Sequence, residues 1–422
     1  MENLFIGISG RCREVLLQKK SLIASILIYT LLSGLLFRSV DGNLSSVTSD
    51  FDFYNNTVIR GPWGEWVSLL ARDLHAQSSY ADPTYRQGWL ATPFYSYLFL
   101  SPIWLFGSQL IFGVLGWCVG VLTLIGFFRL LRQRLKPLPG RLELMLMCLL
   151  PLNFNFLVDS LAVSTMSVAA MFVLLAISSS ARLVRISLLV FAAMTRANYL
   201  IAVACAFIAI LLIRPRGAKS ILVDIFPSVV IAIVFYVIFY STYPGSGLNY
   251  IFITQYQGLD YAQPMGMALS QGVLGIDSEG SLFHSDLGMQ ELFSLLSSLK
   301  AWAYVFNVWA LKVSVTLGLV HEKLFVSDHG FWLLKAWRTI FFLAVTLPGV
   351  YASSLIAFSR NIDPMERLIY FWVLFYLAFN SLLIGDPRYL MGSYFFLALG
   401  LVRVLELISL SQKRLSSERR SF

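Results

Sequence analysis

Two aspartates, Asp50 and Asp52, stand in a polar stretch that follows the first apolar segment of the chain. In an extended chain, side chains two residues apart point to the same side, so these two carboxylates could act together. A carboxylate in such a place could take the proton from an acceptor hydroxyl group, or could hold a divalent cation through its oxygen atoms. The same spacing also occurs in solvated loops, so it nominates the two residues as candidates and no more.

Arginines at the ends of apolar segments form a second group of candidates. Arg388 and Tyr389 precede the last apolar segment, and Arg196 stands between two apolar runs. A guanidinium group presents a fork of donors that matches the oxygen atoms of a phosphate. These arginines could therefore neutralise a phosphate or diphosphate leaving group. The alternatives are an ion pair with Asp386 and contact with lipid phosphate.

The elements that must carry these residues are apolar. Of the 422 residues, 57% are hydrophobic and 13% are charged, whereas about 25% of an average soluble domain is charged. This composition excludes a soluble enzyme, a disordered chain and a disulfide scaffold, and it indicates a polytopic membrane protein. The net charge of +9 is explained by basic cytoplasmic loops. A nucleic-acid partner is not expected, because no basic stripe alternates with aromatic residues.

Apolar segments separated by charged turns predict an all-α transmembrane bundle. At roughly 20 residues for each crossing, the chain offers about ten spans, within a range of roughly nine to twelve. Basic residues gather at alternate ends of these segments and place both chain termini on the cytoplasmic side. The predicted spans are 21–37, 108–131, 142–158, 160–179, 186–196, 198–213, 221–241, 333–358, 367–384 and 389–410.

Two long regions are predicted on the outer side, within a single transmembrane domain that covers residues 1–422. The first outer loop, 39–107, ends in an apolar segment that is too short to cross and is expected to lie in the interface. The second outer region, 242–332, has no Lys or Arg before residue 300. Its apolar helix at 300–320 is expected in the outer interface or against the bundle. Lys312 on this helix is expected to extend its amine to the interface, as lysines near helix ends often do.

Charged groups near spans are costly, so the few that remain at the outer ends are functional candidates. The predicted topology, which rests on Lys and Arg counts alone, brings them all to one face of the membrane. They are Asp50, Asp52, Asp159, Arg196, Asp386 and Arg388. Convergence on one face is what a single active site requires.

Several short motifs resemble those of GT-C type glycosyltransferases, which are membrane enzymes that take sugars from polyprenyl-phosphate carriers. Asp50 and Tyr54 form a D-x-x-x-Y arrangement after the anchor segment, and Gly88-Trp89-Leu90-Ala91-Thr92-Pro93-Phe94-Tyr95 leads into an apolar helix. Thr195-Arg196-Ala197-Asn198 and Arg388-Tyr389-Leu390 each precede a span. The likeness in layout covers most of the chain.

The resemblance implies an inverting transfer of a sugar from a polyprenyl-phosphate donor to a glycan, lipid or protein acceptor. It places the active site on the outer face of a multi-pass protein, with the bacterial inner membrane favoured over the endoplasmic reticulum. Asp50 or Asp52 would be the general base, and the choice stays open because Phe51 stands where many relatives carry an acidic residue. A divalent metal, Mg²⁺ or Mn²⁺, held by these two aspartates is the alternative to metal-free catalysis. Donor phosphate would be bound by Arg388, Arg196 and Tyr389, with Tyr54, Asp159 and Arg60 in supporting roles.

Two other classes of protein share this layout. O-antigen and capsule polymerases also have two large outer loops, but they depend on loop arginines, which the stretch 242–299 lacks. Flippases and other transporters typically have broken helices and internal repeats, and the two halves of this sequence show no repeat. The pattern of essential residues would separate an enzyme from a transporter.

Overall fold

The computed structural model describes residues 2–39, 109–195, 198–215, 218–240, 332–383 and 391–420, together with 255–256, 259–260 and scattered positions from 297 to 317. The helices are α1 (Glu2–Ser39), α7 (Gln109–Gln133), α8 (Gly140–Leu149), α9 (Phe154–Leu161), α10 (Thr165–Ser178), α11 (Arg182–Thr195), α12 (Asn198–Ile213), α13 (Ala218–Tyr240), α16 (Trp332–Phe341), α17 (Leu347–Phe358), α18 (Pro364–Leu383) and α19 (Met391–Arg420). A 3₁₀ turn, η2 (Leu150–Leu152), joins α8 to α9, and a π-helical turn, η7 (Phe342–Thr346), joins α16 to α17. Strands β1 (Gln255–Tyr256) and β2 (Leu259–Asp260) form a small antiparallel pair within residues 242–332, the region predicted to lie outside.

The prediction of a helical membrane protein is confirmed at this level. Within the described part of the chain, four segments are long and apolar enough to cross a membrane, and a bent pair of helices would make a fifth. The four are Lys19–Ser39, Gly113–Gln133, Thr339–Phe358 and Gly392–Gln412, and the bent pair is Gly140–Leu152 with Phe154–Leu161. The finer prediction of about ten spans stays a prediction, as does the assignment of sides.

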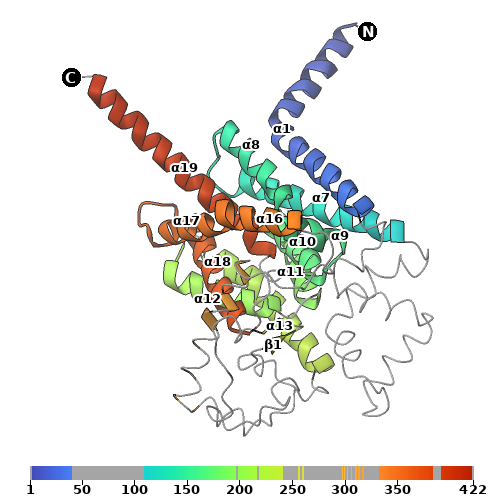
Figure 1. Cartoon of the computed structure of the whole chain (residues 1–422), viewed down its shortest axis with the longest axis vertical. Helices are drawn as coiled ribbons and strands as arrows, with labels where there is room; N and C mark the ends of the chain where they lie inside the picture. Colours follow the sequence, from blue (N-terminus) through green and yellow to red (C-terminus); the bar gives the residue numbers. More distant parts are fainter. Residues whose placement is uncertain are drawn as a thin grey trace.

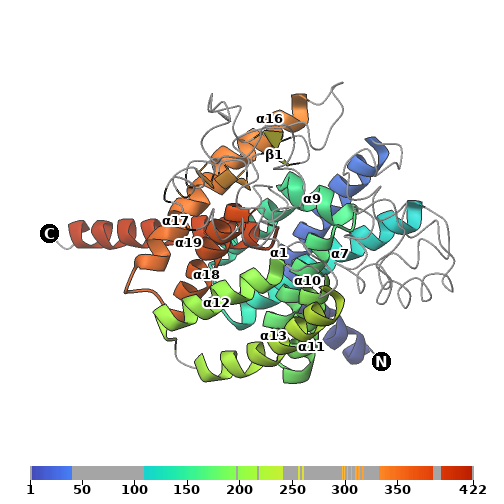
Figure 2. The same ribbon diagram turned by 90° about the horizontal axis from the view of Figure 1, so that it is seen from below.

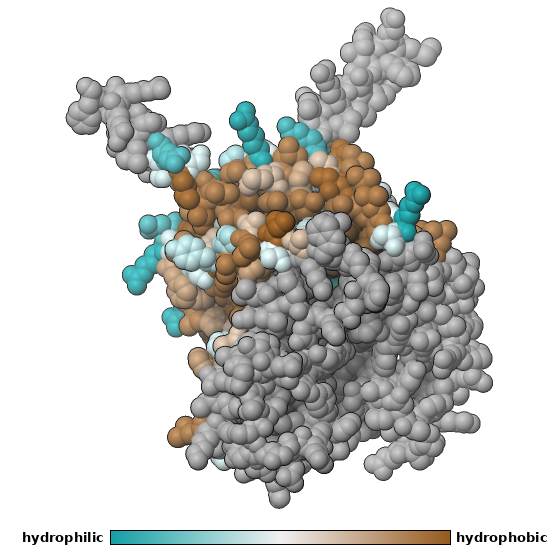
Figure 3. Space-filling model, in the orientation of Figure 1, coloured by the Kyte–Doolittle hydropathy of each residue, from teal (hydrophilic) through white to brown (hydrophobic). Residues whose placement is uncertain are grey.

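Large apolar side chains on the surface support a bilayer environment. Leu27, Leu211 and Phe358 are each more than 60% exposed, and other apolar residues on the same helices are also exposed. Figure 3 shows that apolar side chains make up much of the described surface on the face shown, with hydrophilic side chains at its margins. A soluble monomer rarely exposes apolar area on this scale.

Helices from both halves of the sequence interleave in the bundle. α10 packs against α7, α11 and α19, while α18 packs against α12, α17 and α19. Figure 2 shows α11, α12 and α13 along one side and α16 and α17 toward the other, with α10, α18 and α19 between them. The beginning of α1 and the end of α19 project from the same side of the bundle (Figure 1).

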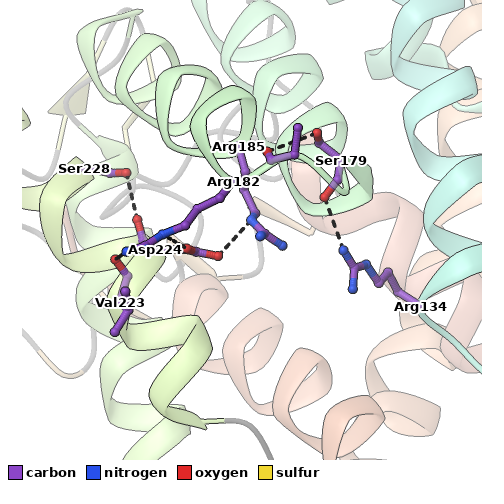
Figure 4. Close-up of polar contacts among 8 residues, drawn as sticks. Arg134, Ser179, Arg182, Arg185, Val223, Asp224 and Ser228 are labelled. Atoms are coloured by element: carbon purple, nitrogen blue, oxygen red, sulfur yellow. Dashed lines mark hydrogen bonds and ion pairs between the residues drawn. The ribbon is translucent and has the colours of Figure 1, made fainter.

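Several helices extend beyond the predicted apolar segments because their charged residues are paired. α11 begins at Arg182 instead of residue 186, since Arg182 and Arg185 both form ion pairs with Asp224 of α13 (Figure 4). α8 begins at Gly140 instead of residue 142, and Glu143 in its first turn contacts Arg132 of α7 at 2.8 Å. Charged residues that suggested loops are therefore part of the helices.

Buried ion pairs join helices within the bundle. Arg403 of α19 contacts Glu366 of α18 at 2.6 Å and Glu406 at 2.8 Å, and it also donates to the carbonyl oxygen of Lys136. Arg403, Glu366 and Glu406 are all buried. A buried charge is tolerated when its hydrogen-bonding capacity is met by partners, so this cluster fixes α18, α19 and the α7–α8 connection relative to one another.

Glycines let α1 and α9 approach α7 closely. A Cβ atom at Gly116 would overlap the backbone of Leu161, and one at Gly120 would overlap the ring of Tyr29. The Tyr29 ring is fully buried and packs against Phe156 at a centroid distance of 5.4 Å. Small residues four positions apart are a common means of close helix packing in membranes.

Gly120→Ala is expected to lower the thermal stability of the purified protein, because the Tyr29 ring has no free space into which it can move. Overpacking of this kind costs about 1–3 kcal/mol. The measurement is Tm in detergent, followed by intrinsic tryptophan fluorescence. Gly34→Ala is the matched control, because no atom lies within 4 Å of its new Cβ. An equal Tm for wild type and Gly120→Ala would contradict the packing described here.

Candidate functional site

A partly open pocket lies beside the break between α8 and α9. Its volume is about 20 Å³, which is room for one or two water molecules, and it brings together four polar and four apolar side chains. These are Asn153, Asn155, Thr346 and Tyr394, and Phe154, Leu317, Phe341 and Phe342. Ligand pockets typically measure about 300–1,000 Å³, so what this small hollow shows is where polar side chains gather within an apolar bundle.

The break that opens the pocket follows from local sequence. Pro151 interrupts the helical hydrogen bonds, since proline lacks a backbone N–H. Asn153 then caps the new helix: its side-chain oxygen accepts the N–H of Phe156 at 3.1 Å. The two helical parts are bent by 58°. As a result, Asn155 meets the start of α19, where its amide donates to the hydroxyl of Tyr394 at 3.1 Å.

The opposite wall of the pocket is a π-helical turn. Phe342 and Thr346, at the two ends of η7, both line the cavity. Pro348 follows directly at the start of α17 and cannot donate a backbone hydrogen bond. π-Turns within α-helices occur frequently at functional sites. Both η7 and the break after η2 border this cavity.

Asp159 is the one predicted site residue that falls within the described structure, and it is buried with 1% exposure. It lies four residues after Asn155 on α9, so the two side chains share one helix face. Its carbonyl oxygen accepts the N–H of Ser164 at 2.8 Å and the hydroxyl of Ser167 at 2.9 Å. These bonds hold the tight turn between α9 and α10.

This turn contains backbone strain. Val163 has φ = 49° and is fully buried. A β-branched residue in the left-handed region is a conformational outlier that persists only where the surroundings impose it. Tyr29 helps to impose it, because its hydroxyl contacts Ser160 at 2.8 Å and the carbonyl of Gly116 at 3.3 Å. The segment that carries Asp159 is thus held by two other helices.

The prediction for Lys312 is wrong: the side chain is buried with 1% exposure instead of reaching the interface. Its Nζ donates to the carbonyl oxygen of Leu382, at 3.4 Å, in the last turn of α18. The carbonyl end of a helix carries partial negative charge and favours a cation there. Lys312 is not part of the candidate spans found among the described residues, and burial lowers its pKa from 10.5 to about 7.

Two further contacts attach the helix of Lys312 to α18. The indole N–H of Trp309 donates to the carbonyl of Ala378 at 2.8 Å, and the hydroxyl of Ser381 donates to that of Thr316 at 3.2 Å. Positions 309, 312 and 316 recur at helical spacing, and this pattern was the available sequence signal for a buried polar face. Leu317, next in sequence, lines the pocket.

The remaining predicted site residues lie outside the described part of the chain: Asp50, Asp52, Tyr54, Arg60, Arg196, Arg388 and Tyr389. Their roles stay predictions. In sequence, Arg388 and Tyr389 stand between the end of α18 at Leu383 and the start of α19 at Met391. Leu382, whose carbonyl oxygen accepts from Lys312, is the residue before Leu383. Tyr394 in the pocket follows Arg388 by six residues.

Metal binding stays a prediction for the same reason, because Asp50 and Asp52 lie outside the described residues. Among the residues that are described, no group of three or more His, Cys, Asp or Glu side chains could hold a metal ion. The comparisons with known proteins add no assignment: no protein-family model, curated protein or solved structure matches the chain.

Lys312 should make the stability of the protein depend on pH. Because the pKa of Lys312 is lower in the folded state, the unfolded state takes up the proton first as the pH falls. The contribution of Lys312 to stability is therefore full above pH 10.5, decreases as the pH falls from 10.5, and is lost below about 7. Lys312→Met removes this titration. The Tm of wild type relative to Lys312→Met should therefore fall between pH 10 and pH 7 and then level off.

The control is Lys219→Met, an exposed lysine on α13. Its Tm relative to wild type should stay constant over the same range. A difference between wild type and Lys312→Met that does not change with pH would contradict the burial of a titrating amine at this position.

Proposed function

We propose that this protein is a multi-pass membrane glycosyltransferase that transfers a sugar from a polyprenyl-phosphate donor to a glycan, lipid or protein acceptor. The observation that carries the proposal is the group of polar side chains where α9, η7 and α19 meet, within an otherwise apolar bundle. A donor with a polar headgroup and an apolar chain needs polar and apolar surfaces next to each other. The resemblance of the sequence motifs to GT-C enzymes supplies the choice of chemistry.

The reaction proposed here is a direct displacement with inversion. Asp50 or Asp52 takes the proton from the acceptor hydroxyl, and the acceptor oxygen attacks the anomeric carbon of the donor sugar. The bond from that carbon to the phosphate oxygen breaks, and polyprenyl phosphate leaves with the bonding electrons. Arg388, Arg196 and Tyr389 neutralise the charge that develops on the phosphate. Tyr54, Asp159 and Arg60 support these groups.

In this proposal the chain makes about ten crossings, has both termini in the cytoplasm and works on the outer face of a bacterial inner membrane. Two observations support it. Both ends of the chain project from one side of the bundle (Figure 1). Arg132 lies at the end of α7 and Arg185 in the first turn of α11. On α18, Glu366 near the start contacts Arg403, whereas the carbonyl of Leu382 near the end accepts from Lys312.

Asp50→Asn and Asp52→Asn test the assignment of the base. Loss of a general base typically lowers the rate by about 10²–10⁴-fold, so one single variant, and the double variant, should lose transfer. The measurement is mass spectrometry of lipid-linked glycans and surface polysaccharide in a deletion strain complemented with each variant. Asp73→Asn, in the same outer loop, is the matched control. Full transfer by the double variant would refute this role.

A second candidate is a flippase for lipid-linked glycans. It is favoured by the 58° break at η2 and by the π-turn at η7, because discontinuous helices commonly surround the sites of transporters. A polyprenyl-phosphate sugar reconstituted in vesicles without acceptor distinguishes the two functions. A flippase moves the donor across the bilayer, whereas a glycosyltransferase leaves it in place. An O-antigen or capsule polymerase remains the alternative enzyme, without an observation of its own in the described structure.

A further inference from the structure

The side chain of Asn153 carries a buried hydrogen-bond donor at the pocket beside α9. Its Oδ1 atom accepts the N–H of Phe156 at 3.1 Å and caps α9. Because only the oxygen end of an amide can accept this bond, the NH₂ end points away from that N–H. The Nδ2 atom is buried and has no hydrogen-bond partner among the described residues. Buried donors in native proteins are generally satisfied by protein groups or by ordered water.

The pocket that Asn153 lines has the volume of a small hydration site. Its volume of about 20 Å³ exceeds the roughly 10–15 Å³ that one water molecule needs. The other polar side chains on its wall are Asn155, Thr346 and Tyr394. A buried water molecule typically makes about two to four hydrogen bonds, so the pocket offers both the space and the number of polar groups that such a molecule requires.

The wall of the pocket favours an uncharged ligand. The eight described residues that line it are all uncharged. An anion or a metal ion would lose its hydration there without gaining an opposite charge, which is costly. A purely apolar ligand would leave the amide of Asn153 unsatisfied. Water meets both conditions, because it is neutral and its oxygen can accept from Nδ2.

Thr346 is the second group that such a water molecule would contact. Asn155 and Tyr394 bind each other at 3.1 Å, whereas Thr346 lines the pocket from the last position of η7 and is 2% exposed. A threonine hydroxyl can both donate and accept. A bond to this hydroxyl connects the π-turn with whatever the Asn153 amide binds.

We infer that the pocket beside α9 binds one ordered water molecule, which accepts from Nδ2 of Asn153 and donates to the hydroxyl oxygen of Thr346. The water thereby joins the two irregular segments of the pocket wall, the break after Pro151 and the π-turn η7. A bridging water is nearly as favourable in enthalpy as a direct hydrogen bond, so it holds these segments in register. This site does not depend on the proposed enzymatic activity.

The direct test is a crystal structure of the full-length wild-type protein at a resolution that shows ordered water. One peak of density should lie within hydrogen-bond distance, about 2.7–3.2 Å, of both Asn153 Nδ2 and Thr346 Oγ1. A pocket without this peak, in a structure that shows buried water elsewhere, would overturn the proposal. A protein group bound directly to Nδ2 would also overturn it. This experiment needs no substitution, so it holds even if a variant fails to fold.

A double-mutant cycle tests the bridge itself. Asn153→Ser keeps a capping oxygen at the start of α9 and removes the amide donor, while Thr346→Val removes the hydroxyl and keeps the shape of the side chain. The measurement is the unfolding constant in mixed micelles of sodium dodecyl sulfate and dodecyl maltoside. Because each substitution breaks the same bridge, the effect of Thr346→Val should be at least about twofold smaller in Asn153→Ser than in wild type.

The matched control is Thr123→Val, which removes a buried hydroxyl from α7. Thr123 is 1% exposed, donates to the carbonyl of Val119 at 2.7 Å and is not part of the pocket wall. Its effect should be the same in Asn153→Ser as in wild type. Coupling as large in this control would overturn the proposal in favour of general destabilisation. Additive effects of Asn153→Ser and Thr346→Val would overturn the bridge even where water is seen beside Asn153.

Discussion

The structure depends on pairing of the few charged groups that an apolar bundle contains. Arg403 illustrates this constraint: Glu366, Glu406 and the carbonyl of Lys136 surround it, and all three charged side chains are buried. Leaving such a charge unpaired would cost several kcal/mol, on the order of 3–5. Such pairs therefore join helices that are far apart in sequence and fix them relative to one another.

With these helices fixed, the bundle can accommodate irregular backbone elsewhere. The 3₁₀ turn at Pro151 and the π-turn at 342–346 both interrupt regular helical hydrogen bonding. In a membrane protein such interruptions are tolerated where protein or a polar cavity satisfies the backbone. Here the two interruptions border one pocket, where Asn155 and Tyr394 meet. The paired charges and the polar side chains at the irregular turns therefore form two distinct regions of the molecule.

Particular residues show how far sequence reasoning reached. The apolar segments predicted a helical membrane protein, because crossing a bilayer requires continuous runs of apolar residues. They did not predict the break at Pro151, which divides the predicted span 142–158 into α8 and α9. Asp159 was found because a charged residue beside a span is conspicuous. The start of α11 was placed too late, because Arg182 and Arg185 look like loop residues until Asp224 is seen to pair with them. Lys312 was assigned to the interface because its acceptor, the carbonyl oxygen of Leu382, lies 70 residues away in sequence and no local pattern indicates it.

The sequence by itself determined that this is a helical membrane protein, because hydropathy is a property of each segment alone. It also nominated Asp50, Asp52 and Arg388 from residue type and spacing. The tertiary structure alone decided which polar groups share a site. Asn155 and Tyr394 are 239 residues apart, and neither is conspicuous in its own segment. Their contact exists because α9 is bent toward the start of α19, and that position results from packing between distant helices, which no local pattern encodes.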